Sequence, residues 1–225
     1  ELGRAEDAVA GAWRSQGGTR SRLRVSSTTA LAELRSVQPA SVVPATLELA
    51  DVRLVLAQSY GAPSWVRLVQ ACRLTEAIWR DDAEALEELL TAHPHLLHES
   101  ALIRESHWGP PLSYAANLGR DAIIRALHVL GATDHLHAIE RAALQGKVDT
   151  AILLHELAGK PAVPDGALSG AAYTLNVAGT EFALGLGVKV VDADDRRLAP
   201  VDVVLETDSR KPSAKHRILQ LYAEH

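Results

Sequence analysis

Histidines are the residues of this chain with the clearest capacity for chemistry, because neutral imidazole is a common zinc ligand. The sequence contains ten histidines. His135 and His137 stand two residues apart, and this spacing turns both side chains to the same face of an extended segment. With His107 from the preceding connection, they would supply the three nitrogen ligands of a catalytic zinc site. No cysteine or carboxylate completes an established ligand spacing, so we predict no bound metal and expect solvated histidines.

Other kinds of catalysis lack a recognisable motif. The sequence contains no Gly-x-Ser-x-Gly elbow, no glycine-rich phosphate loop and no His-Glu-x-x-His helix. The single cysteine, Cys72, has apolar neighbours, which predicts a buried and unreactive thiol. Asp192, Asp194 and Asp195 lack the glycine and distal glutamate of an EF-hand, so we expect an exposed acidic hairpin. We therefore predict a chain that is not an enzyme and holds no cofactor.

Residues 108–132 predict two short helices joined by a tight turn. Pro111 fits the first turn of a helix, Ala115 and Ala116 allow close packing, and Gly119 can end the helix with a positive φ. The second helix is indicated by an apolar stripe that ends at a glycine: Ile123, Ile124, Leu127, Leu130 and Gly131.

This segment resembles one ankyrin repeat. Pro111-Leu112-Ser113 stands where the Thr-Pro-Leu-His signature of the repeat has Pro-Leu-His. The resemblance implies an all-α solenoid, in which each helix pair packs against its neighbours. Another solenoid of helical hairpins would bury the same apolar stripe.

The order of helix, glycine and helix returns further along the chain. Gly146 follows Gly119 by 27 residues, and Gly179 restores the usual step of about 33 residues. Gly187 comes only eight residues after Gly179. This short step predicts a helix that has lost about one turn, unless residues are missing from the sequence.

Weaker units flank this central pattern. Residues 74–90 carry a helical pair with a turn at Arg80-Asp81-Asp82, and a last unit runs over residues 200–224. We therefore predict about five helix-turn-helix units, which form an ankyrin-repeat domain over residues 68–225.

Residues 1–67 are predicted to form an amino-terminal helical cap region. Helical patterns cover residues 6–14, 29–37 and 47–60. The stretch Tyr60-Gly-Ala-Pro-Ser-Trp65 resembles the turn between two helices that precedes the repeats in many bacterial ankyrin-repeat proteins. The resemblance implies that Trp65 packs under this turn, and it implies no activity.

Composition excludes several classes of partner. Of the 225 residues, 47% are hydrophobic and 4% are aromatic, and the formal net charge is −5. This balance argues against a nucleic-acid-binding surface, which needs a concentrated basic face. No apolar run approaches the roughly 18 to 20 residues of a membrane span, and a lone cysteine suits a reducing compartment. We expect a cytoplasmic protein that binds neither nucleic acid nor membrane.

The candidate binding residues follow from the ankyrin register, which exposes the hairpin tips and the outer edge of each first helix on one concave side. Trp, Tyr and Arg contribute most of the energy at protein interfaces. Trp108 and Tyr114 could instead pack against the next repeat. The exposed positions predicted in this way, with the histidines considered above, are Trp108, His107, Tyr114, Asn117, Leu118, Arg141, Leu144, Gln145, His135 and His137, and less surely Tyr173 and Asn176.

These observations predict a non-enzymatic module that binds another protein or a peptide. The alternative is an enzyme or small-molecule-binding protein that uses a cleft between the helical cap and the first repeats. In that alternative, the histidines and Trp108 would be the working groups. The sequence predicts neither the partner nor the oligomeric state.

Overall fold

The computed structural model describes residues 48–103, 108–190, 200–207 and 211–225. Within these ranges all regular secondary structure is helical, which confirms the predicted all-α class. The expected helices over residues 6–14 and 29–37, His107 and the acidic stretch 192–195 lie outside the described residues. None of the described helices is long and apolar enough to cross a membrane.

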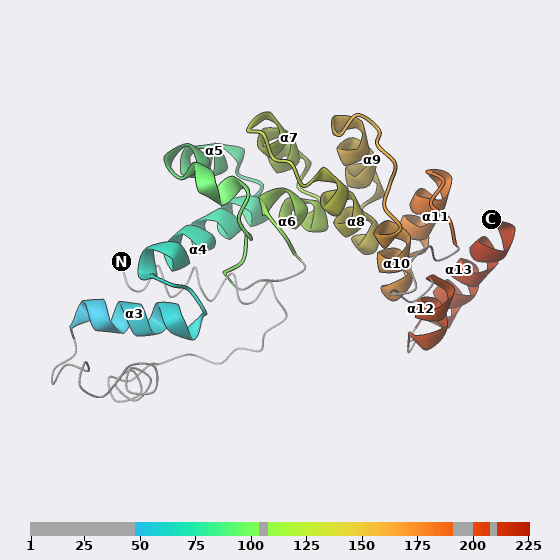
Figure 1. The fold of residues 1–225 in the computed structure, drawn as a ribbon, viewed down its shortest axis with the longest axis horizontal. Helices are drawn as coiled ribbons and strands as arrows, with labels where there is room; N and C mark the ends of the chain where they lie inside the picture. Colours follow the sequence, from blue (N-terminus) through green and yellow to red (C-terminus); the bar gives the residue numbers. More distant parts are fainter. Residues whose placement is uncertain (1–47, 104–107, 191–199, 208–210) are drawn as a thin grey trace. The chain divides into compact units, whose positions relative to one another are not determined.

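Figure 1 labels the helices in chain order, and short turns join several successive pairs, such as α6 with α7 and α8 with α9. Their bounds are α3 Leu49–Ser59, α4 Trp65–Arg80, α5 Ala83–Ala92, α6 Pro111–Leu118, α7 Asp121–Val129, α8 His135–Gln145, α9 Val148–Leu157, α10 Gly166–Tyr173, α11 Val177–Gly185, α12 Pro200–Glu206 and α13 Pro212–Glu224, with a 3₁₀ turn η1 at Pro94–Leu97.

Contacts between residues divide the chain into two units, the first made of residues 1–76 and 102–106. Its described core joins α3 to the first part of α4 through Ala57, Leu68 and Cys72, and Trp65 packs against this core as the sequence predicts. Burial, followed by the neighbouring Glu76 charge, raises the pKa of the Cys72 thiol to about 11. Cys72 is thus buried as expected, and its thiolate is suppressed. The boundary at residue 68 between a cap and a repeat domain stays a prediction.

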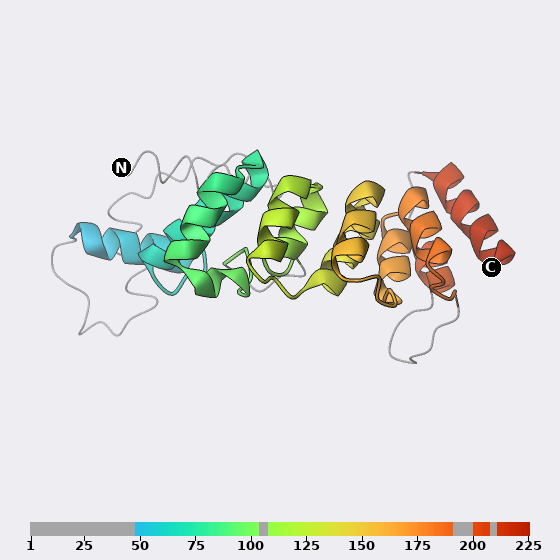
Figure 2. The ribbon, with the colours of Figure 1, turned by 90° about the horizontal axis from the view of Figure 1, so that it is seen from above.

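The second unit contains residues 77–101 and 107–225 and is built from two rows of helices (Figures 1 and 2). In one row α6 packs on α8, α8 on α10 and α10 on α12. Each of these inner helices also pairs with the helix that follows it, and the outer helices α5, α7, α9, α11 and α13 form the second row. Each helix pair therefore buries its apolar face mainly against the neighbouring pairs.

Four helices, α4, α6, α8 and α10, end in the same way. A residue with a positive φ, between 53° and 70°, follows α4, α6 and α8 directly and follows α10 after Thr174: Asp81, Gly119, Gly146 and Leu175. In all four, the N–H of this residue donates to the carbonyl three positions back, and the next N–H donates to the carbonyl five positions before it. These bonds satisfy helix carbonyls that would otherwise lack a partner.

The predicted register of the third unit is wrong. Leu175, not Gly179, follows the inner helix in the left-handed conformation. Gly187 comes 12 residues after Leu175, and Gly131 comes 12 residues after Gly119, so the outer helix has not lost a turn. Gly179 instead lies inside α11, where a Cβ would collide with the Ala143 carbonyl oxygen of α8.

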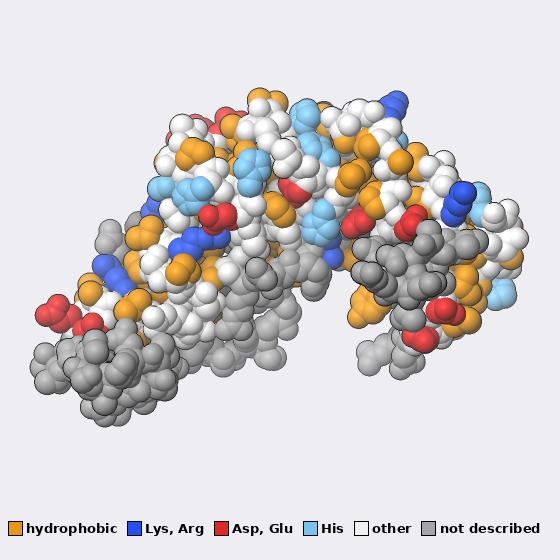
Figure 3. All heavy atoms as spheres, viewed as in Figure 1, with side chains coloured by type: hydrophobic (Ala, Val, Ile, Leu, Met, Phe, Trp, Pro, Cys, Tyr) orange, Lys and Arg blue, Asp and Glu red, His pale blue; other side chains and the backbone are white. Residues whose placement is uncertain are grey.

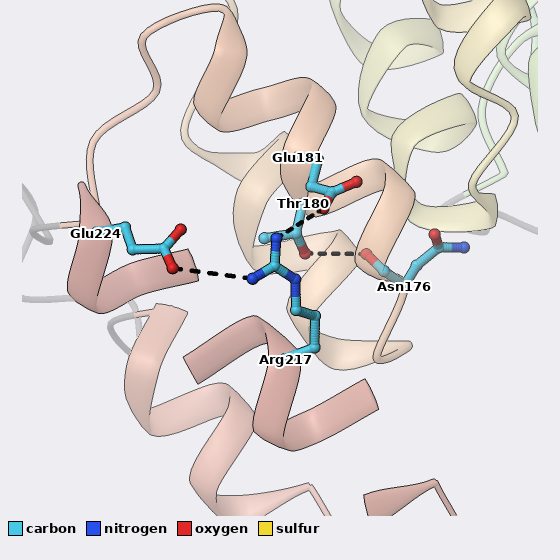
Figure 4. A network of polar contacts seen from close by, with 5 residues as sticks. All are labelled: Asn176, Thr180, Glu181, Arg217 and Glu224. Carbon is cyan, nitrogen blue, oxygen red and sulfur yellow. Dashed lines mark hydrogen bonds and ion pairs between the residues drawn. The ribbon is translucent and has the colours of Figure 1, made fainter. Parts of the chain in front are cut away.

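The buried core confirms most of the apolar stripe predicted for residues 108–132. Ile123, Ile124 and Leu127 are buried on α7, whereas Leu130, at the end of that helix, is exposed. At the carboxyl-terminal end, α11 and α13 also meet at the surface (Figure 4). There Arg217 forms ion pairs with Glu181 at 3.4 Å and Glu224 at 3.9 Å. Such exposed pairs contribute little stability, typically below about 1 kcal/mol.

Candidate functional site

Four of the predicted residues, Trp108, Tyr114, Asn117 and Arg141, form one cluster between α6 and α8, which we call the arginine cluster. The Trp108 and Tyr114 rings lie 5.6 Å apart between centroids, and the Arg141 guanidinium lies 5.4 Å from the centre of the Trp108 ring. Arg141 Nη2 donates to Asn117 Oδ1 at 2.6 Å. Aromatic pairs of this kind contribute about 0.5–1.5 kcal/mol beyond their area.

The expectation of exposure is wrong for Asn117 and Arg141, whereas Tyr114 packs in the interior, as the alternative for that residue predicted. Tyr114, Asn117 and Arg141 are buried, Arg141 retaining only 6% of its exposed surface, while Trp108 is half-buried in the turn before α6. Arg141 reaches from α8 to α6, so it is covered by the neighbouring helix instead of facing solvent. The result is a buried cation that contacts a half-buried indole ring.

Burial lowers the pKa of Arg141, and the charge of Glu140 opposes part of this effect. Removing a guanidinium from water costs free energy unless hydrogen bonds and counter-charges replace the lost hydration. Asn117 supplies one such bond, and the Trp108 ring supplies a cation–π contact of about 0.5–2 kcal/mol. These contacts hold the guanidinium in one position.

The common helix ends define a second feature, which we call the inner-helix row. It consists of the residues two positions before the left-handed residues that follow α4 and the inner helices α6, α8 and α10: Trp79, Asn117, Leu144 and Tyr173. Trp79 is 46% exposed and Tyr173 is 69% exposed. The Arg120 side chain donates to the Trp79 carbonyl at 2.6 Å, which ties the end of α4 to the turn after α6. Two exposed aromatic residues therefore occupy equivalent positions on either side of Asn117 and Leu144.

Sequence reasoning missed Trp79. The available signal was Asp81, because Asp is among the few residues other than glycine that adopt the left-handed conformation. Aligning Asp81 with Gly119 would have placed Trp79 level with Asn117.

The remaining predicted positions have different surroundings. Gln145 is exposed at the end of α8, and Leu118 and Leu144 are partly buried. Asn176 lies outside the row, because it caps α11 by accepting a bond from the Gly179 N–H at 3.1 Å.

A serine, an aspartate and a histidine meet beside the arginine cluster. The Asp134 carboxylate accepts bonds from the Ser113 N–H at 3.1 Å and from the Ser113 hydroxyl, and His137 Nδ1 lies 2.9 Å from the same hydroxyl oxygen. In a hydrolytic triad the carboxylate binds the histidine, and the histidine takes the serine proton. Here the carboxylate binds the serine itself, and Ser113 is fully buried. The arrangement joins the start of α6 to the start of α8 and presents no nucleophile.

His135 and His137 do not converge, contrary to the geometry that we considered for a zinc site. Both lie on α8, where residues two apart point about 200° from each other. His135 Nε2 lies 2.9 Å from His128 Nδ1 of α7, while His137 contacts Ser113. Figure 3 shows histidine side chains spread over one face of the molecule instead of gathered at one point.

No group of three or more histidine, cysteine or acidic side chains within the described ranges has the arrangement of a metal site. Burial is the largest effect on His135 and lowers its pKa, and the His128 charge lowers it further. The charge of Asp134 and a backbone hydrogen bond at Thr133 oppose this shift.

Comparison with known proteins gives no family for the chain. No model of a known protein family matches it, and no curated protein matches it.

Proposed function

We propose that this chain is an ankyrin-repeat module that binds another protein or a peptide and catalyses no reaction. The helix pairs of the second unit, with their repeated helix ends, support the repeat assignment. The observation that carries the binding proposal is the combination of exposed Trp79 and Tyr173 on the inner-helix row with the half-buried Trp108.

This surface has the composition of a binding hot spot. Trp, Tyr and Arg are enriched among the residues that dominate interface energies, and rigid rings lose little conformational freedom on binding. The Trp108 ring is already held by Tyr114 and Arg141, which reduces the ordering cost when a partner binds. Because α6, α8 and α10 pack in succession, a partner that lies along the row can contact several helix pairs at once.

Capture of binding proteins from a lysate of the source organism, with identification by mass spectrometry, tests this proposal. Tyr173→Ala should remove the captured proteins, because a hot-spot residue contributes about 2 kcal/mol or more of binding free energy. Its melting temperature should change little, because the side chain is mostly exposed.

Val129→Ala is the matched control, because Val129 is 83% exposed on the outer helix α7. It also removes exposed apolar surface, but on the other row of helices. Equal loss of capture in the two variants, or no loss in either, would contradict the assignment of the inner-helix row as the binding surface.

A further inference from the structure

Arg141 has hydrogen-bonding capacity that the described residues do not use. A guanidinium carries five N–H donors on three nitrogens. Nη2 donates to Asn117, and Nε is sealed from solvent without a partner. The third nitrogen, Nη1, has no acceptor among the described residues. Unlike Nε, it is not sealed from solvent.

No carboxylate forms an ion pair with Arg141 in the described part of the chain. Glu140 is adjacent in sequence, but its carboxylate is directed to the start of α10, where it fills the space that a Cβ on Gly166 would occupy. Buried charges in proteins are normally paired, because an unpaired buried charge is strongly destabilising. Among the described residues, the guanidinium of Arg141 therefore feels the charge of Glu140 but has no carboxylate hydrogen-bonded to it.

The anion that best fits a guanidinium is a carboxylate, which accepts charge-assisted hydrogen bonds. We propose that Arg141 receives the side-chain carboxylate of an aspartate or glutamate in an extended peptide that lies along the inner-helix row. This inference rests on the proposed function and specifies the chemistry of the partner. The carboxylate would accept from Nη1 next to the Trp108 ring.

The position of Arg141 favours an internal acidic residue over a chain terminus. Arg141 belongs to α8, with Trp79 and Trp108 on the side of α4 and α6. Exposed Tyr173 belongs to α10, which packs on α8 on the other side. Contact surface thus continues in both directions from the guanidinium, as an extended segment requires, whereas a terminal carboxylate would leave one direction uncovered.

A selection from a random peptide library displayed on phage, with the full chain immobilised, provides the test. Peptides enriched on this chain, and not on an unrelated protein, are synthesised with an amidated carboxyl end, so that every carboxylate is a side chain. Each is compared with its Asp→Asn or Glu→Gln counterpart by fluorescence anisotropy. We expect one acidic position whose amide version binds roughly 30-fold more weakly, the effect of removing about 2 kcal/mol of a desolvated charge pair.

A protein variant then assigns that acidic position to Arg141. Arg141→Gln should bind the acidic and amide peptides with equal affinity, because the charge that distinguishes them is gone. Circular dichroism checks that the variant is folded, and if it is not, the peptide comparison alone still decides whether a carboxylate is recognised.

The outcomes separate this inference from the proposed function. If no peptide is enriched on the chain, the carboxylate inference fails, whereas the proposed function is decided by the capture experiment. Enriched peptides that bind equally well as amides would overturn the carboxylate inference and leave the binding module intact. A requirement for a free carboxyl terminus, or an acidic preference that persists in folded Arg141→Gln, would also overturn it.

Discussion

Replacing Gly179 by alanine tests the packing between helix pairs most directly. An added Cβ would meet the carbonyl oxygen of Ala143 in α8 and would lie 3.3 Å from the Ala171 side chain. Since the obstacle is backbone, no rotamer change relieves it, and α11 must move away from α8. Overpacking of a core costs roughly 1–3 kcal/mol, and the better helix propensity of alanine offsets up to about 1 kcal/mol. We expect Gly179→Ala to lower the free energy of unfolding by about 2 kcal/mol.

Gly185→Ala in the same helix is the matched control, because no atom lies within 4 Å of its added Cβ. This change should leave stability unchanged or raise it by up to about 1 kcal/mol through helix propensity. Urea unfolding followed by circular dichroism gives the midpoint and slope for each variant. A midpoint for Gly179→Ala at or above that of Gly185→Ala would refute the close contact between α11 and α8.

Three further predictions concern the core, the arginine cluster and pH. Leu127→Ala should lower the free energy of unfolding by roughly 2–5 kcal/mol through the cavity that it leaves. Arg125→Ala should be near neutral because Arg125 is exposed, and equal urea midpoints for the two variants would show that the register of α7 is wrong. Trp108→Ala should cost about 1–3 kcal/mol from its aromatic and cation–π contacts, and an unchanged midpoint would show that these contacts contribute nothing. Burial and the His128 charge lower the pKa of His135 in the folded chain, so the unfolded chain binds a proton at this residue more readily. The free energy of unfolding should therefore fall as the pH drops from about 7 through the unfolded pKa near 6.5 and toward the lower folded pKa. Thermal melts at pH 7.5 and 5 should show a smaller pH effect in His135→Gln, and an identical effect would assign the dependence to other groups.

The sequence predicts the fold best where local chemistry alone decides the conformation. Gly119 and Gly146 end their helices as expected, because glycine adopts a positive φ without steric cost. Leu175 adopts the same conformation with no local signal. A left-handed leucine costs roughly 1–2 kcal/mol, and its burial in the core with α11 and α13 offsets that cost. The conformation of Leu175 depends on tertiary packing. A prediction based on glycines alone therefore placed the end of the inner helix of the third unit at Gly179.

The candidate site was predicted in part, and for a similar reason. Tyr114, Asn117 and Arg141 could be named from their helix positions, because the periodicity of α6 and α8 was correct. Their burial could not be predicted from the sequence, because it arises when Arg141 of α8 reaches across to Asn117 of α6. The separation of His135 from His137 depended on where α8 begins, and helix boundaries are the least certain part of a pattern.

The shared ending of α4, α6, α8 and α10 has a consequence for how the gene can change. The same pair of hydrogen bonds is made by Asp81, Gly119, Gly146 and Leu175. A crossover that joins the codons up to one of these residues to the codons that follow another would preserve both bonds. Unequal recombination at these points adds or deletes one whole helix pair, and the array changes length without interrupting a helix. The 27 residues from Gly119 to Gly146 form such an exchangeable segment, and Arg141 lies within it. Duplication of this segment would therefore add a second copy of this arginine, and loss of the segment would remove the buried cation.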